Sequence, residues 1–79
     1  MTTETQANPR RRMWQAWKHT EKARDFAVEM RAAAHKDERL DLEQFYTEFI
    51  FHNSKERAFL RKICRGAFSC DPDELESYK

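Results

Sequence analysis

Glycine and proline are almost absent from this chain, and their scarcity restricts the fold more than any other feature. The 79 residues include one Gly and two Pro. An all-β chain needs such residues at its many turns, so helices are favoured before any periodicity is considered. A chain of this length also has room for only one hydrophobic core. The sequence therefore predicts a single small all-α domain.

The first helix is marked by its capping residues. Asn8 provides a side-chain oxygen for the cap, and Pro9 follows in the first turn, where its missing N–H is not needed. The apolar periodicity continues to about residue 35. Residues 1–7 are polar and lack periodicity, which predicts a flexible N-terminal tail before a helical domain spanning residues 8–79.

The second helix is predicted to begin at a capping box. Asp41 is the cap acceptor, Gln44 lies three residues later, and Leu40 can pack on Phe45 as a hydrophobic staple. The helix would then end at Asn53, after about residue 52. Its apolar side chains cover a wide arc, which predicts contacts with more than one neighbour.

Two further helices follow in this interpretation. Ser54 would cap the third, and Gly66 would mark its end. Asp71 and Pro72 then form the start of a short fourth helix anchored by Leu75 and Tyr78. The predicted fold is a three-helix core with a short C-terminal fourth helix, at about 9–35, 42–52, 54–66 and 72–78.

The core face of the first helix is predicted from apolar residues at helical spacing. Its members are Ala16, His19, Ala23, Phe26, Ala27, Met30, Ala33 and Ala34. Most of them are alanines, so neighbouring helices could approach closely while each contact buries little area.

Charged residues occur in blocks of alternating sign. Residues 9–24 hold six bases and one acid, 37–48 five acids and one base, 55–65 five bases and one acid, and 71–79 four acids and one base. On successive antiparallel helices such blocks would attract one another. The pattern predicts an electrostatically self-matched bundle.

A face rich in Trp and Arg is the first candidate binding site. Five residues share a side of the first helix away from the predicted core: Arg10, Trp14, Trp17, Arg24 and Val28. Trp and Arg dominate protein-interface hot spots, which favours a protein partner. The alternative is that the tail or the fourth helix covers both rings. Because Trp17 borders the core arc, burial is favoured for Trp17 and a binding role for Trp14.

Basic residues form the second candidate site. They are Arg10, Arg11 and Arg12 at the helix start, and Lys55, Arg61, Lys62 and Arg65 on the outward face of the third helix. Both groups could contact phosphates, although the pI of about 7.8 is below the value above 9 typical of a dedicated nucleic-acid domain. A solvated basic face is the alternative.

Metal binding, cofactors and catalysis are not expected. The sequence has no CxxC, HxxxH or HExxH spacing, Gly-rich phosphate loop or nucleophile elbow. His19 and His52 are predicted to lie at the core edge, Cys64 to be buried and inert, and Cys70 to be exposed. The start has no signal-peptide pattern and no apolar run long enough for a membrane span, so a cytoplasmic location is expected.

The sequence thus predicts a small non-enzymatic regulator or inhibitor that binds a larger protein through the Trp/Arg face. The alternative is a helical nucleic-acid-binding module that uses the basic residues. Either could be a monomer or a homodimer, because a second copy could complete the wide apolar arc of residues 42–52 and cover Phe51.

Overall fold

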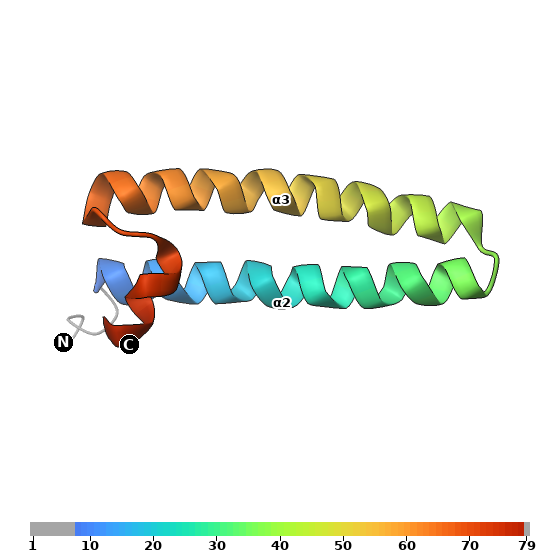
Figure 1. Ribbon diagram of the computed structural model, residues 1–79, viewed down its shortest axis with the longest axis horizontal. Helices are drawn as coiled ribbons and strands as arrows, with labels where there is room; N and C mark the ends of the chain where they lie inside the picture. The colour runs from blue at the N-terminus through green and yellow to red at the C-terminus, as the bar shows by residue number, and fades with distance from the viewer. Residues whose placement is uncertain (1–7, 79) are drawn as a thin grey trace.

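Two long antiparallel helices and one short 3₁₀ helix make up the fold (Figure 1). The computed structural model describes residues 8–78, and side chains as far as Leu75. Helix α2 spans Pro9–Lys36, helix α3 spans Leu40–Phe68, and η1 spans Pro72–Tyr78. The described residues contain no strand, which confirms the all-α prediction. The predicted tail and the side chain of Tyr78 lie outside the described part.

Helix α2 begins as its capping residues predict. The side chain of Asn8 accepts hydrogen bonds from the backbone N–H groups of Arg10 and Arg11, at 3.1 and 3.2 Å. At the other end, Glu38 adopts a left-handed conformation with φ of 58°. This turn lets the N–H of Arg39 donate to the carbonyl of Ala34 at 2.9 Å, so the chain reverses within three residues.

Helix α3 shows that the predicted three-helix core is wrong. The two helices expected at 42–52 and 54–66 are one continuous helix of 29 residues. Asn53 does not cap a helix end, because its side chain crosses to α2 and donates to the carbonyl of Thr20 at 3.1 Å. No Pro interrupts this span, and the helix continues past Gly66 to Phe68.

The expected capping box at the start of α3 is not formed either. Asp41 lies inside the helix and forms an ion pair with Arg39, and this pairing lowers the pKa of the Asp41 carboxyl group. Leu40 and Phe45, expected to form a hydrophobic staple, are both largely exposed. The helix begins instead directly after the tight turn at residues 37–39.

The two helices meet along a seam whose buried residues recur at spacings of three and seven on α2 and of eleven on α3. On α2 the buried side chains are Trp17, Thr20, Ala27 and Ala34, and on α3 they are Asn53 and Cys64. Such spacing is typical of helices packed nearly parallel to each other. The predicted core face of α2 is therefore rotated from the observed seam. Only Ala27 and Ala34 of that set are buried, while Ala16, His19, Phe26 and Ala33 are exposed.

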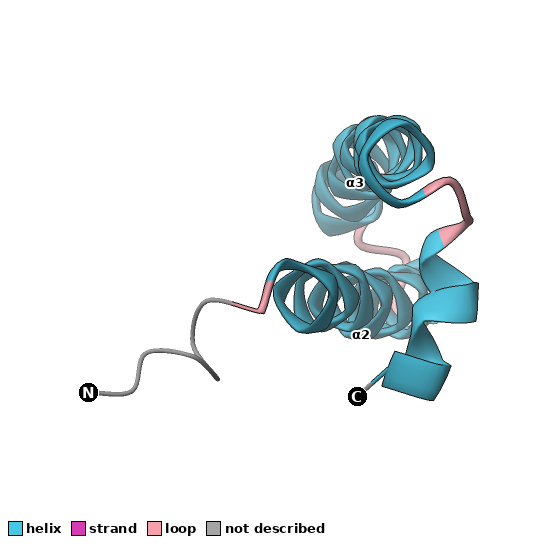
Figure 2. Cartoon of the chain, turned by 90° about the vertical axis from the view of Figure 1, so that its left-hand side faces the viewer, coloured by secondary structure: helices cyan, strands magenta, loops and turns pink. Residues whose placement is uncertain are grey.

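The predicted fourth helix is a 3₁₀ helix that folds back against one side of the hairpin (Figure 2). Asp71 begins it, since its carbonyl accepts from the N–H of Glu74 at 2.9 Å and its own N–H donates to the Glu74 side chain. Pro72 and Leu75 are buried, which confirms Leu75 as an anchor. One side of the hairpin is thus covered at its open end, where the helices start and finish.

Candidate functional site

Trp17 is an internal anchor of the fold and is 1% exposed. Its indole Nε1–H donates to a carboxylate oxygen of Asp73 in η1 at 2.8 Å. The guanidinium of Arg57 lies 3.7 Å from the ring centroid and donates to the Trp17 carbonyl and the Thr20 hydroxyl. This position is within the range of a strong cation–π contact, and burial lowers the pKa of Arg57. The burial that the sequence favoured for Trp17 is confirmed.

The other members of the predicted Trp/Arg face do not form one open surface around Trp17. Arg10 lies over the ring of Phe68 at 5.2 Å, and Arg24 forms an exposed ion pair with Asp25. Trp14 is half-buried and lines a shallow groove with basic side chains from the next turns of α2. Val28 is exposed. The structure therefore divides the predicted face into an internal anchor and separate surface positions.

The basic residues of α3 are partly used within the fold. Arg65 pairs with Asp71 at 2.5 Å, and this contact raises the pKa of Arg65. Arg61 lies 5.2 Å from the Trp17 ring, and Lys55 lies over Phe51. Lys62 is exposed, as are Arg11 and Arg12 at the start of α2.

The hairpin places the two basic blocks at the same end, so the expected self-matching of charges is wrong. Because α3 returns antiparallel to α2, residues 55–65 lie beside residues 9–24 (Figure 1). The acidic block at 37–48 occupies the opposite, loop end. The molecule is therefore polarised along its length, and four acids in the segment 71–79 reduce the positive charge of the open end only in part.

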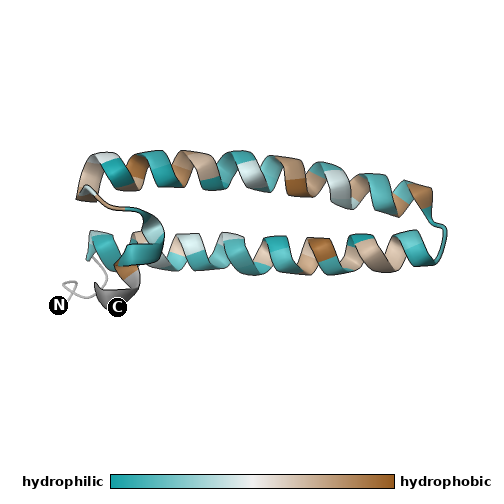
Figure 3. Cartoon of the chain, viewed as in Figure 1, coloured by the Kyte–Doolittle hydropathy of each residue, from teal (hydrophilic) through white to brown (hydrophobic). Residues whose placement is uncertain are grey.

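The largest unassigned feature is an apolar face that runs along both helices on the side away from η1. We define it by ten residues: Ala16, Ala23, Phe26 and Met30 of α2, and Leu42, Phe45, Phe49, Phe59, Ile63 and Ala67 of α3. The six large side chains other than Met30 are all more than a third exposed. Figure 3 shows apolar segments recurring along both helices, including the loop half.

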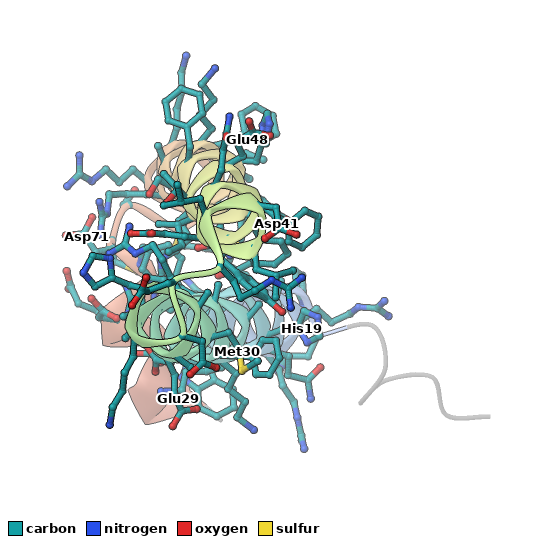
Figure 4. All side chains as sticks on the ribbon, turned by 90° about the vertical axis from the view of Figure 1, so that its right-hand side faces the viewer. His19, Glu29, Met30, Asp41, Glu48 and Asp71 are labelled. Carbon is teal, nitrogen blue, oxygen red and sulfur yellow. The ribbon has the colours of Figure 1, made fainter. Side chains whose placement is uncertain are left out.

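Shared grooves show that the two helices contribute to one face. One groove is lined by Ala23 with Phe49, and another by Ala16 with Ile63 and Ala67. Towards the loop, the rings of Phe26 and Tyr46 meet edge to face at 6.4 Å. Figure 4 places His19, which lines the first groove, on the opposite side of the hairpin from Asp71 at the start of η1.

All four α2 residues of this face belong to the arc that helical periodicity assigned to the core. Periodicity shows that apolar side chains share an arc, whereas it does not show which chain covers the arc. His19 and His52, predicted at the core edge, are exposed beside this face. The wide arc predicted for residues 42–52 was the available signal, since the seam uses only part of it.

The two cysteines differ in environment. Cys64 is completely buried in the seam, and burial together with the neighbouring Cys70 raises the pKa of its thiol to about 11. Cys70 is half-buried beyond the end of α3. Within the described residues, no group of three His, Cys, Asp or Glu side chains is placed to hold a metal ion.

Neither of the two long helices combines the length and apolar character needed to cross a membrane, within residues 8–78. Comparisons with protein families, with curated proteins and with solved structures find no match for this chain.

Proposed function

We propose that this chain is a non-enzymatic protein-interaction module and that its contact surface is the apolar face. The observation that carries the proposal is the exposure of large apolar side chains along the whole hairpin. Contiguous apolar patches of more than a few hundred Å² are rare on monomers and mark interaction sites. A regulatory or inhibitory role suits such a module, because a small chain acts on a larger one by occupying a surface.

The proposed contact surface differs from the Trp/Arg face that the sequence favours. Trp17 cannot anchor a partner while it is packed between α2, α3 and η1. Phe45 and Phe59 take over the anchoring role, since they are among the most exposed aromatic residues and lie on the same side of α3. Trp14, Arg24 and Val28 lie outside the apolar face and serve the proposal only as secondary contacts.

A photo-crosslinking phenylalanine analogue tests the proposal directly. Placed at Phe45, it should form protein adducts in cells. The matched control is the same analogue at Phe51, which is 57% exposed compared with 59% for Phe45 but lies about 120° away around the helix. Adducts from position 45 and few from position 51 would support the apolar face. Equal adducts from both positions, or none from position 45, would contradict it.

Nucleic-acid binding is the second candidate, and one observation favours it. The hairpin brings Arg10–Arg12 to the same end as Lys55, Arg61, Lys62 and Arg65. If this end contacts phosphates, binding should weaken log-linearly with salt, and Lys62→Ala should lower the slope by about one. Phe45→Ser should leave that binding unchanged. A protein interaction through the apolar face predicts the reverse sensitivity to the two substitutions.

A further inference from the structure

The apolar face extends well beyond what the fold itself covers. We propose that a second copy of this chain covers it, with the two hairpins stacked face to face and antiparallel in a four-helix bundle. The two-fold axis would lie in the interface, perpendicular to the helices. This inference rests on the proposed function, because it names the partner of the same face.

The area of the face is suited to a dimer. Taking roughly 200 Å² for a free Phe side chain, the rings of Phe26, Phe45, Phe49 and Phe59 expose about 400 Å² in one chain. Two copies would bury about 800 Å² from these rings alone, compared with about 1,200–2,000 Å² in a stable interface. Leu42, Ile63 and the small residues of the same face supply further apolar area.

The large residues of α3 are arranged symmetrically about one point. Phe49 and Phe59 lie five residues on either side of Ser54, and Phe45 and Ile63 lie nine residues on either side of it. When two identical helices pack antiparallel about this point, Phe49 meets Phe59 of the second copy, and Phe45 meets Ile63. Leu42 would then lie opposite Gly66, where an added Cβ would meet nothing within 4 Å.

Helix α2 has a matching centre. Ala16 and Met30 lie seven residues on either side of Ala23. The two centres lie within about one helical turn of each other along the hairpin, because Asn53 donates to the carbonyl of Thr20 and one groove is lined by Ala23, His52 and Asn53. One two-fold axis can therefore serve both helices. An isologous interface requires this property, since each residue pair must occur twice.

Charge selects the antiparallel arrangement over the parallel one. The loop end carries the acidic block 37–48, and the open end carries the basic blocks 9–24 and 55–65. Antiparallel stacking places the acidic end of each copy over the basic end of the other. Parallel stacking would place like charges together at both ends, which disfavours that orientation.

The interior of a single hairpin is thin where the second copy would add most. Trp17, Cys64 and Leu75 are buried at the open end, whereas the loop half buries only Ala27 and Ala34 among its apolar residues. Phe26 and Phe45 lie in this loop half and are both exposed. A second copy would give these rings the cover that the chain does not provide itself.

Sedimentation equilibrium of the purified full-length chain tests the association. We expect twice the mass of one chain at high concentration, with dissociation on dilution. Phe49→Ser combined with Phe59→Ser should give the single-chain mass, and the control Phe51→Ser should retain the double mass. A single-chain mass for the wild type at every concentration would overturn the proposal, as would a double mass that the Phe49/Phe59 variant retains.

Thermal melting of the wild type covers the case in which the double variant does not fold. A dimer coupled to folding gives a midpoint that rises with chain concentration, whereas a monomer gives a constant midpoint. A constant midpoint would overturn the proposal without any variant.

Disulfide crosslinking tests the orientation. In a Cys70→Ser background, chains carrying Phe45→Cys are mixed with chains carrying Ile63→Cys. Antiparallel stacking predicts that the mixed disulfide forms faster than either single variant links to itself. Self-linked Phe45→Cys chains as the main product would overturn the antiparallel arrangement.

Failure of this inference is distinguishable from failure of the proposed function. If the wild type sediments as a single chain but the analogue at Phe45 still captures a different protein, the apolar face binds another partner and the second copy is excluded. If position 45 captures no protein, the proposed function fails as well.

Discussion

The open end and the loop end of the same hairpin are stabilised in different ways. At the open end, three segments distant in sequence meet around Trp17, and Asp73, Arg57 and Leu75 close the cluster. At the loop end, the apolar residues buried between α2 and α3 are alanines, while aromatic rings lie outside. Both helices contribute to both ends, so the two ends differ because different side chains lie in the seam there.

The two ends differ in how much large apolar side-chain area the chain buries by itself. Burial of a large side chain contributes about 1.5–3 kcal/mol, and the open end obtains such contributions from Trp17 and Leu75 within one chain. The loop end lacks such contributions, because Phe26 and Phe45 are exposed. The open end thus buries most of the large side chains of the fold, while exposed apolar side chains lie along both halves of the hairpin.

Replacing Trp17 should have the largest effect. Trp17→Ala removes a buried ring and should lower the free energy of unfolding by about 3–5 kcal/mol. The matched change at the loop end, Phe26→Ala, removes an exposed ring and its edge contact with Tyr46, at a cost of about 1 kcal/mol. Urea unfolding followed by circular dichroism, at a concentration where the chain is monomeric, measures both. Similar losses for the two variants would break the comparison.

The reactivity of the cysteines should sharpen the comparison at the open end. The Cys64 thiol has a pKa of about 11 compared with an ordinary value of 9.0, so it stays neutral at pH 8 and should resist iodoacetamide. Cys70 should be alkylated first, which mass spectrometry of the labelled peptides would show. Since the neutral thiol is favoured in the folded state, the stability from Cys64 is fully present below about pH 9 and declines as the pH rises towards 11. Faster labelling of Cys64 than of Cys70 would contradict this account.

The smallest expected effect lies in the turn at the loop end and has the opposite sign. Glu38 has a φ of 58°, in the left-handed region that favours glycine. Glu38→Gly should raise the free energy of unfolding by about 0.5–1 kcal/mol, because it relieves this strain. Thermal unfolding compared with Glu38→Ala, which keeps a Cβ, provides the measurement. No difference between Gly and Ala would show that the turn carries no strain.

Local signals in the sequence were sufficient for some elements and not for others. Asn8 and Pro9 predicted the start of α2 correctly, because a helix cap involves residues adjacent in sequence. Asn53 and Ser54 resemble a helix cap in sequence, yet the Asn53 side-chain amide donates to the carbonyl of Thr20 on the facing helix. A contact between residues 33 positions apart cannot be identified from local pattern, and this is why one helix was predicted as two.

The candidate site shows the same limit in another form. Helical periodicity correctly placed Ala16, Ala23, Phe26 and Met30 on one arc, but it assigned that arc to the interior. The observed seam instead passes through Thr20 and Asn53, two polar residues that hydropathy would place outside. The burial expected for Trp17, which borders the interior, is confirmed, whereas the binding role expected for Trp14 stays a prediction.

The bond between Trp17 and Asp73 has a consequence for the order in which the molecule assembles. This hydrogen bond joins residues 56 positions apart in the sequence, whereas the turn at residues 37–39 connects the end of α2 to the start of α3 within a few residues. Because closing a long loop costs more chain entropy than closing a short one, we expect the hairpin to zip from the turn towards the open end. The most stable region would then be completed last. During synthesis, the Trp17 ring would stay without its η1 contacts until Asp73 and Leu75 have emerged from the ribosome.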